Sequence, residues 1–277
     1  MAALFWLKAA AVGLVSGILS GMFGVGGGII TTPAIRLLLG GSAISAVAST
    51  LPPIILTSIT GALSYARNRI ADVPSGLQVG GWGALLAVAG AYLTKFIGGS
   101  FLLLATATII TYMAVDMALL ALGVPQTAGT TETPLADEEA MLAARHPGRH
   151  VFQPTPAALA VVGAVTGLYS GLLGLGGGFV IVPVLTRWFA FSAKRAIGTS
   201  LVAIAILSVP ATVTHALLGH IDWRIAVALS VMVIPGVLVG ARITRAASER
   251  GVRLGFAALL VISAVLLAGN ELLVLLR

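Results

Sequence analysis

A glycine-rich stretch at Gly13–Pro33, GLVSGILSGMFGVGGGIITTP, constrains the fold of this chain more than any other feature. It recurs 150 residues later as Gly163–Pro183, GAVTGLYSGLLGLGGGFVIVP. Seven glycines and one serine, Ser20 or Ser170, keep the same relative positions in the two copies. Because glycine adopts non-helical backbone conformations easily, a glycine triplet inside an apolar run breaks a helix. The fold must therefore accommodate the same helix break twice.

The repeat extends well beyond the glycines. The 150-residue offset continues without a gap as far as Lys95, which pairs with Arg245, and it also pairs Asp72 with Asp222. An unbroken register of this length indicates an internal duplication. We therefore predict two homologous repeats joined by a polar connector, with bounds at 1–122 for the first repeat, 123–155 for the connector and 156–277 for the second repeat.

The composition indicates a membrane protein. Of the 277 residues, 58% are hydrophobic and only 9% are charged, and the mean hydropathy is +1.06. Soluble domains carry about a quarter charged residues, so this chain cannot cover a water-facing surface. Apolar runs of about 20 residues predict an all-α polytopic membrane protein with about eight transmembrane helices, four in each repeat. The expected spans are 4–39, 43–66, 76–96, 100–122, 155–190, 192–218, 225–244 and 252–275, and the first span of each repeat is broken at its glycine triplet.

Four spans in each repeat would give both repeats the same sense in the membrane. The pseudo-twofold axis would then run along the membrane normal. A re-entrant crossing in each half would invert the repeats instead, and the sequence leaves that alternative open. The distribution of Lys and Arg over the expected loops favours both termini outside the cytoplasm.

The two glycine triplets are the best candidates for a binding site. Gly26, Gly27 and Gly28 and their counterparts Gly176, Gly177 and Gly178 would free backbone N–H groups. The helix that restarts after each break would point its positive end at that break, as in transporters that bind anions near the bilayer midplane. The evenly spaced Gly13, Gly17 and Gly21 fit close helix packing instead.

Hydroxyl side chains form the second repeated feature. Ser49 and Thr50 align with Thr199 and Ser200, so both repeats carry two hydroxyls at the same register of a span. We expect them to donate hydrogen bonds to a bound anion, although such hydroxyls can also bond the carbonyls of their own helix. Thr31 and Thr32 are weaker candidates, because the second copy carries Ile181 and Val182 there.

Three further residues are candidates for coupling or gating. Tyr65 aligns with His215, and a histidine can carry a proton because its unperturbed pKa is about 6.5. Asp116 is an acid within an expected span, which suggests a function. Each of the three lies near a span end, so an interfacial position without function is the alternative. Coupling to protons or to sodium is left open.

Several classes of function are excluded or disfavoured. The chain has no cysteine, and its four histidines lack metal-ligand spacing, so no metal site and no cofactor is expected. The glycine motifs lack the lysine and the strand of a nucleotide-binding loop. Catalytic constellations are absent, which argues against an enzyme. The net charge of +7 lies in short loops, as topology requires, and does not predict nucleic-acid binding.

These motifs resemble those of a known family. The pattern GxxxGxxGxGGGxxxxP at Gly17–Pro33 and Gly167–Pro183, followed by AVAST or AIGTSL, resembles the TauE/SafE family of sulfite exporters, also called the 4-toluenesulfonate uptake permease family. The resemblance covers nearly the whole chain. It implies a carrier in the bacterial inner membrane that moves sulfite, sulfoacetate, thiosulfate or a related small anion.

We therefore expect a secondary transporter of a small sulfur-containing anion that works by alternating access. Its expected partners are the small anion and the lipid bilayer, and assembly as a homodimer is left open. A passive anion channel is the first alternative. A membrane-embedded accessory subunit that binds an anion without moving it is the second.

Overall fold

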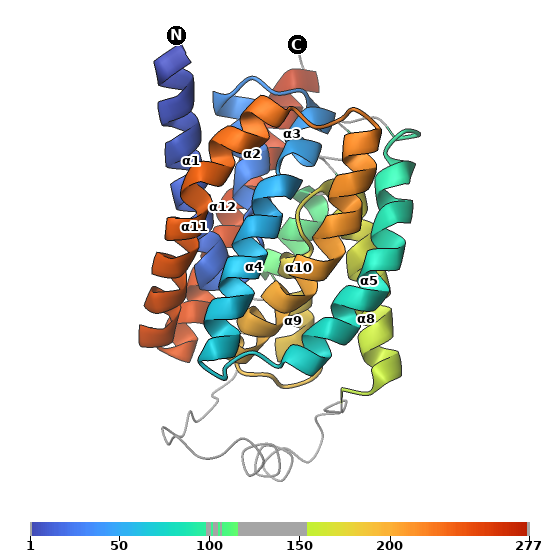
Figure 1. Cartoon of the computed structure of the whole chain (residues 1–277), viewed down its shortest axis with the longest axis vertical. Coiled ribbons are helices and arrows are strands. Elements are labelled where there is room, and N and C mark those ends of the chain that lie inside the picture. The colour runs from blue at the N-terminus through green and yellow to red at the C-terminus, as the bar shows by residue number, and fades with distance from the viewer. Residues whose placement is uncertain (1, 98–100, 102–104, 106, 116–153, 276–277) are drawn as a thin grey trace.

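The computed structural model describes residues 2–97, 101, 105, 107–115 and 154–275, and this part of the chain contains helices and no strands (Figure 1). The expected all-α membrane fold is confirmed at this level. Six described segments are long and apolar enough to cross a membrane: Leu4–Phe23, Ala43–Arg67, Val73–Leu93, Pro156–Leu173, Ala193–Leu217 and Trp223–Ala246. The expected span 100–122 lies mostly outside the described residues, as does the connector 123–155.

The first glycine-rich stretch folds into two helices that form a hairpin. Helix α1 (Ala2–Phe23) ends before the triplet and α2 (Gly28–Leu38) begins at its last glycine. Near the end of α2, Ile35 packs in one cluster with Val12 of α1, so α2 returns toward the level at which α1 started. We expected one broken span over residues 4–39, and that expectation is wrong. The chain reverses because Gly26 and Gly27 have φ values of 78° and 93°, which favour glycine.

The second glycine-rich stretch folds in the same way. Helix α8 (Pro156–Leu173) ends before its triplet and α9 (Gly178–Arg187) begins at Gly178. Gly176 and Gly177 also have positive φ values, 77° and 78°. In Figure 1, α9 lies toward the opposite end of the molecule from α2.

The remaining helices surround these two hairpins. Ser42 caps α3 with its side chain, and Asp72 does the same for α5, so each of these helices starts at a hydrogen-bonded residue. Ser192 and Asp222 cap α10 and α11 in the equivalent manner. The bounds are α3 (Ala43–Ser49), α4 (Leu51–Arg67), α5 (Val73–Leu93), α10 (Ala193–Leu217), α11 (Trp223–Ala246) and α12 (Glu249–Leu275).

The evenly spaced glycines pack helices, as expected. A methyl group on Gly13, Gly17 or Gly21 would meet the backbone carbonyl of Leu229, Val233 or Val237 on α11. The equivalent glycines of α8 pack in the same way against the backbone of α5. Each half therefore inserts its first helix against the third span of the other half, and the halves are not separate bodies.

The direction of these contacts shows that equivalent helices run in opposite directions. Along α1 and α11, the numbers of the residues that touch increase together: Gly13 meets Leu229 and Gly21 meets Val237. The same is true of α8 with α5 and of α5 with α10, so the two helices of each pair are parallel. Helix α4 precedes α5 through a short turn and runs against it, so α4 is antiparallel to its counterpart α10 (Figure 1). The expectation of two halves with the same sense is wrong. Each hairpin reverses the chain once without crossing the molecule, so the spans that follow the two hairpins, α4 and α10, run in opposite directions.

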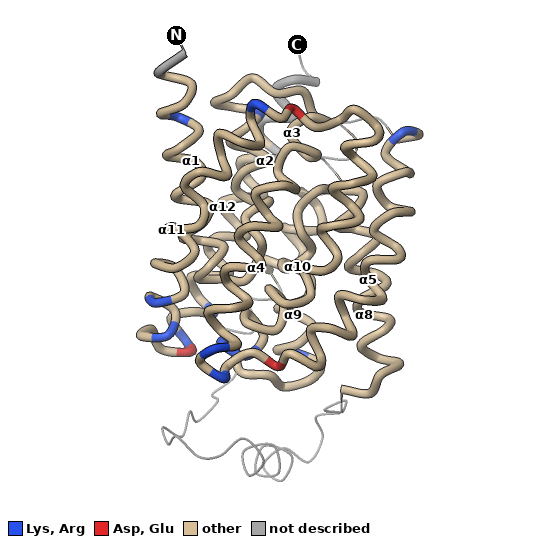
Figure 2. Tube along the Cα trace, in the orientation of Figure 1, with Lys and Arg blue, Asp and Glu red and all other residues tan. Residues whose placement is uncertain are grey.

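The two ends of the molecule differ in charge (Figure 2). We call the end that holds Asp72 and the start of α10 the basic end, and the end that holds His220 and the start of α11 the histidine end. The ends of α4, α9 and α11 and the starts of α10 and α12 lie toward the basic end and carry Arg67, Arg69, Arg187, Lys194, Arg195, Arg242, Arg245, Arg250 and Arg253. The starts of α1 and α11 and the ends of α2 and α5 lie toward the histidine end, and the described basic residues there are Lys8, Arg36, Lys95 and Arg224.

Candidate functional site

The two glycine turns meet inside the helix bundle. A methyl group on Gly28 would lie 2.6 Å from Cα of Leu175, and one on Gly178 would lie 2.6 Å from Cα of Val25. Only glycine allows the two turns to approach this closely. The structure therefore brings together the two predicted triplets, which are 150 residues apart in the sequence.

Two helix N-termini converge at this place. Helices α2 and α9 start at Gly28 and Gly178 and lead away toward opposite ends of the molecule (Figure 1). The first N–H groups of a helix have no acceptor within that helix and carry a partial positive charge. Such a start favours an anion. Two starts side by side double that preference, without burying a charged side chain.

Buried hydroxyls without a hydrogen-bond partner lie in the helices that flank the turns. Among the described residues, Ser20, Thr32, Thr166 and Ser170 have such hydroxyl groups, and none of the four residues is more than 1% exposed. Cβ of Ser20 lies 3.8 Å from the position of a methyl group on Gly27, and Cβ of Ser170 lies 3.6 Å from the equivalent position on Gly177. Since an unpaired buried hydroxyl costs about 1–3 kcal/mol, a bound partner would remove this penalty.

The predicted hydroxyls Thr50 and Ser200 tie the turns in place. Thr50 Oγ1 donates to the carbonyl of Gly174 at 2.6 Å, and Ser200 Oγ donates to the carbonyl of Gly24 at 2.8 Å. Each also bonds a carbonyl three residues back in its own chain. Both hydroxyls are therefore bound to backbone in this conformation, and each links one half of the chain to the glycine turn of the other.

The neighbouring hydroxyls Ser49 and Thr199 hold the ends of helices. Ser49 Oγ accepts a hydrogen bond from the N–H of Asp222 at 2.8 Å, and Thr199 Oγ1 accepts one from the N–H of Asp72 at 3.0 Å. This pairing is again reciprocal between the halves. All four predicted hydroxyls thus lie near the turns or the adjoining helix ends.

The coupling candidates Tyr65 and His215 occupy equivalent positions at opposite ends of the molecule. Tyr65 donates to the carbonyl of Gly21 at 2.8 Å, and Nε2 of His215 lies 2.9 Å from the carbonyl oxygen of Gly171. Each therefore contacts the last turn of the helix that precedes a glycine turn. The third candidate, Asp116, lies outside the described residues.

The centre is closed in this conformation. Gly26 and Gly176 both face the same two side chains, Ile54 and Ile204, whose methyl carbons lie 3.1–3.3 Å from where a glycine methyl would be. All residues of both triplets are buried. An anion could reach the turns only after these isoleucines or the hairpins move.

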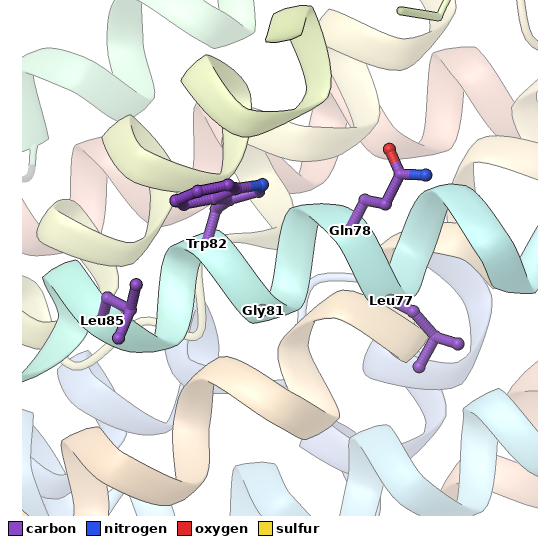
Figure 3. Close-up of a pocket in the computed structure, with 5 residues that line it drawn as sticks. All are labelled: Leu77, Gln78, Gly81, Trp82 and Leu85. Carbon is purple, nitrogen blue, oxygen red and sulfur yellow. The ribbon is translucent and has the colours of Figure 1, made fainter. Parts of the chain in front are cut away.

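Two surface cavities lie away from the glycine turns. One is an apolar groove of about 350 Å³ along the outer face of α5, lined by Leu77, Gln78, Gly81, Trp82 and Leu85 (Figure 3). Its exposed leucines and tryptophan face the bilayer in a membrane protein. The other cavity, of about 370 Å³, opens at the histidine end and is lined by Ser42, Ile44, Ser45, Gly219, His220, Ile221 and Asp222.

Sequence reasoning named Thr32 as a weaker candidate and missed the other three unpaired hydroxyls. Ser20 and Ser170 were noticed only as small residues that keep the glycine register, and Thr166 was not singled out. A polar side chain repeated within two otherwise apolar, glycine-rich helices was a usable signal. Within the described residues no group of three metal-ligating side chains comes together.

A family of known proteins matches nearly the whole chain. Residues 9–267 match the family described as Sulfite exporter TauE/SafE. The chain belongs to this family, as its glycine motifs predicted. It is a membrane transporter of the TauE/SafE type and not an enzyme.

Similar proteins carry transporter names. The chain is 27% identical over 254 residues to the probable membrane transporter protein YunE of Bacillus subtilis. The alignment covers 86% of this chain and 87% of YunE. It is 25% identical to the probable membrane transporter protein YdhB of the same organism, over 82% of this chain and 86% of YdhB. No solved structure gives a significant match.

Proposed function

We propose that this chain is a secondary transporter of a small sulfur-containing anion, built from two inverted repeats and residing in the bacterial inner membrane. The observation that carries the proposal is the meeting of two oppositely directed helix starts, at Gly28 and Gly178, beside unpaired buried hydroxyls. The predicted residues Gly26, Gly27, Gly176 and Gly177 complete the two turns.

The chemistry of this place suits a sulfonate or sulfite. Such an anion presents three acceptor oxygens, and the site offers groups that can donate to them: backbone N–H groups and the hydroxyls of Ser20, Thr32, Thr166 and Ser170. A carboxylate would also bind here, but it presents one oxygen fewer. Family membership supports a sulfur-containing anion over a carboxylate.

Inversion of the repeats supports alternating access over a pore. In transporters with inverted repeats, the two halves exchange conformations about a site near the midplane. Here the cavity at the histidine end and the ion pair at the basic end occupy equivalent places, and Ile54 and Ile204 close the centre between them. If the two halves exchange conformations, one end opens while the other closes, and each half uses contacts that the other half already makes.

The charge difference between the ends supports an orientation. Cytoplasmic ends of membrane proteins are enriched in Lys and Arg. The basic end would therefore face the cytoplasm, and both termini, which lie toward the histidine end in Figure 1, would face the outside. This agrees with the orientation that the sequence favoured, although the sequence predicted a crossing where each half has a hairpin.

Transport is tested by counterflow in proteoliposomes. Purified protein preloaded with unlabelled sulfite, thiosulfate or sulfoacetate should take up the labelled anion by counterflow and should saturate. A pore would show neither counterflow nor saturation, and an accessory subunit would bind the anion without moving it.

Ser20→Ala and Ser170→Ala probe the site itself. Removal of an unpaired buried hydroxyl should leave thermal stability unchanged or raised, while anion affinity should fall by about tenfold for each hydroxyl that binds the anion. Ser58→Ala and Ser208→Ala are matched controls, since these buried hydroxyls bond only their own helix. Unchanged counterflow in the Ser20→Ala, Ser170→Ala double variant would contradict the assigned site.

A further inference from the structure

A pair of histidines links the cavity at the histidine end to the second glycine hairpin. Nδ1 of His215 lies 3.2 Å from Nδ1 of His220, and Nε2 of His215 lies 2.9 Å from the carbonyl oxygen of Gly171. His215 is fully buried, whereas His220 lines the cavity and is partly exposed. The pair thus reaches from water to the last turn of α8.

The hydrogen bonds fix the protons on both rings. A carbonyl oxygen can only accept, so Nε2 of His215 carries a proton and donates it to Gly171. In the neutral ring Nδ1 of His215 is therefore an acceptor, and Nδ1 of His220 must be the donor to it. Nε2 of His220 is then without a proton and able to take one from the cavity.

We propose that His215 and His220 form a proton-binding relay that couples proton uptake from the histidine end to anion transport. Nε2 of His220 accepts a proton from cavity water. The Nδ1–H bond of His220 then breaks, and its proton moves to Nδ1 of His215. The transfer leaves His220 neutral and His215 as an imidazolium, with one proton gained by the pair. The inference rests on the proposed anion transport.

The charge would arrive where it can act on the site. Gly171 lies in the last turn of α8, and a cation at a helix C-terminus is stabilised by the helix dipole. Three residues further on, Gly174 accepts the hydrogen bond from Thr50 that ties the hairpin down. Protonation of His215 therefore changes the charge beside one glycine turn, which favours an anion in the closed centre.

The surroundings of the pair keep it neutral until the cavity is acidified. Burial and the charge of Lys95 lower the pKa of His220 from its ordinary value of 6.5. The carboxylate of Asp222 lines the same cavity and accepts N–H groups of its own helix, while α8 presents only the Gly171 carbonyl to His215. Because the pKa of His220 is lowered, the pair takes up its proton only when the cavity is acidified.

The other half cannot do the same. Tyr65 makes the equivalent bond to the carbonyl of Gly21, and the position equivalent to His220 is Ile70. A tyrosine donor does not become a cation, so proton binding belongs to one end of the molecule. This asymmetry provides a matched control variant.

The test uses proteoliposomes with labelled thiosulfate or sulfite in the external solution, and it compares the initial rate of uptake with and without a pH gradient. In wild-type protein, acidification of the histidine side should raise initial uptake by up to about tenfold per unit of pH while the pH is above the pKa of the pair, and the rate should level off below that pKa. In His215→Gln the ratio of the two rates should fall to about one, because glutamine keeps a donor for Gly171 but takes no proton. Tyr65→Phe should keep the wild-type ratio. A ratio of one in wild type, or an unchanged ratio in His215→Gln, would overturn the relay.

Two further measurements separate this inference from the proposed function. Counterflow at equal pH involves no net proton movement, so its absence in wild type would refute anion transport alone. Histidine ¹⁵N resonances of the purified protein decide on proton binding without transport. We expect one coupled uptake of a proton by the pair on acidification to about pH 5, and two rings that both stay neutral there would overturn the relay.

Discussion

Asp72 and Arg195 form an ion pair, with Oδ2 of Asp72 lying 2.7 Å from Nη2 of Arg195, at the basic end of the bundle. In the other half the equivalent residues are Asp222 and Ser45, and both line the open cavity at the histidine end. One end is thus closed by a charge pair where the other end is hollow. This difference breaks the symmetry of the two halves and bears on which end opens.

Asp72→Asn should ease opening of the basic end. The substitution removes the ion pair, while an amide oxygen can still accept the N–H of Ser75 at the start of α5. Because the ion pair is partly exposed, its loss should lower the free-energy preference for the closed basic end by about 1 kcal/mol. The population that is open at this end should then rise roughly fivefold. The natural chain has no cysteine. The measurement is therefore the rate at which a maleimide reagent labels a single cysteine placed at Ile70.

Asp222→Asn provides the control for that experiment. Asp222 caps α11 just as Asp72 caps α5, but among the described residues it has no ion pair. Labelling at Ile70 should be unchanged by Asp222→Asn. Equal acceleration by both substitutions would mean that helix capping, and not the ion pair, governs opening.

Ser200→Ala should loosen the first glycine turn. The hydroxyl of Ser200 donates to the buried carbonyl of Gly24, and its removal leaves that carbonyl without this donor at a cost of about 1–3 kcal/mol. Ser208→Ala removes a buried hydroxyl from the same helix that bonds only the carbonyl of Ile204. Thermal unfolding in detergent should show a clear loss for Ser200→Ala and a small one for Ser208→Ala. Equal losses would show that Ser200 does not tie the turn.

Gly167→Ala should be strongly destabilising, because its methyl group would meet the backbone carbonyl of Gly83 on α5. Backbone cannot move aside as a side chain can, so we expect a loss of roughly 1–3 kcal/mol or more. A glycine on the outer face of α5 is the control, since Gly81 has no atom within 4 Å of a new methyl group. Gly81→Ala should be neutral or stabilising by up to about 1 kcal/mol. Thermal unfolding of both variants checks the prediction.

Much of this fold could be predicted from the sequence, because the repeat carries its own register. The offset of 150 residues that pairs Thr50 with Ser200 also pairs their hydrogen-bond acceptors, Gly174 and Gly24. The packing role of Gly17 and its neighbours followed from their spacing alone. Local periodicity and repetition are sufficient for such conclusions.

The direction of the spans could not be predicted in the same way. Hydropathy measures the length of an apolar run, and it cannot tell a helix that continues after a break from one that turns back. The positive φ values of Gly26 and Gly27 decide that question, and hydropathy does not report backbone dihedral angles. The partners of Ser49 and the lack of partners at Ser20 likewise depend on contacts between distant segments.

The inverted arrangement itself gives a sharp prediction for two equivalent positions. Asn68 follows the end of α4 and Leu218 follows the end of α10, and they are 150 residues apart in the duplicated register. Parallel repeats would place both on one side of the membrane, whereas antiparallel α4 and α10 place them on opposite sides. In cells, an impermeant maleimide should label Leu218→Cys directly, since the histidine end faces outward by its lower positive charge. It should label Asn68→Cys only after permeabilisation. Labelling of both from the same side would contradict the inverted repeats, and a reversal of the two sides would change the orientation while leaving the inversion intact.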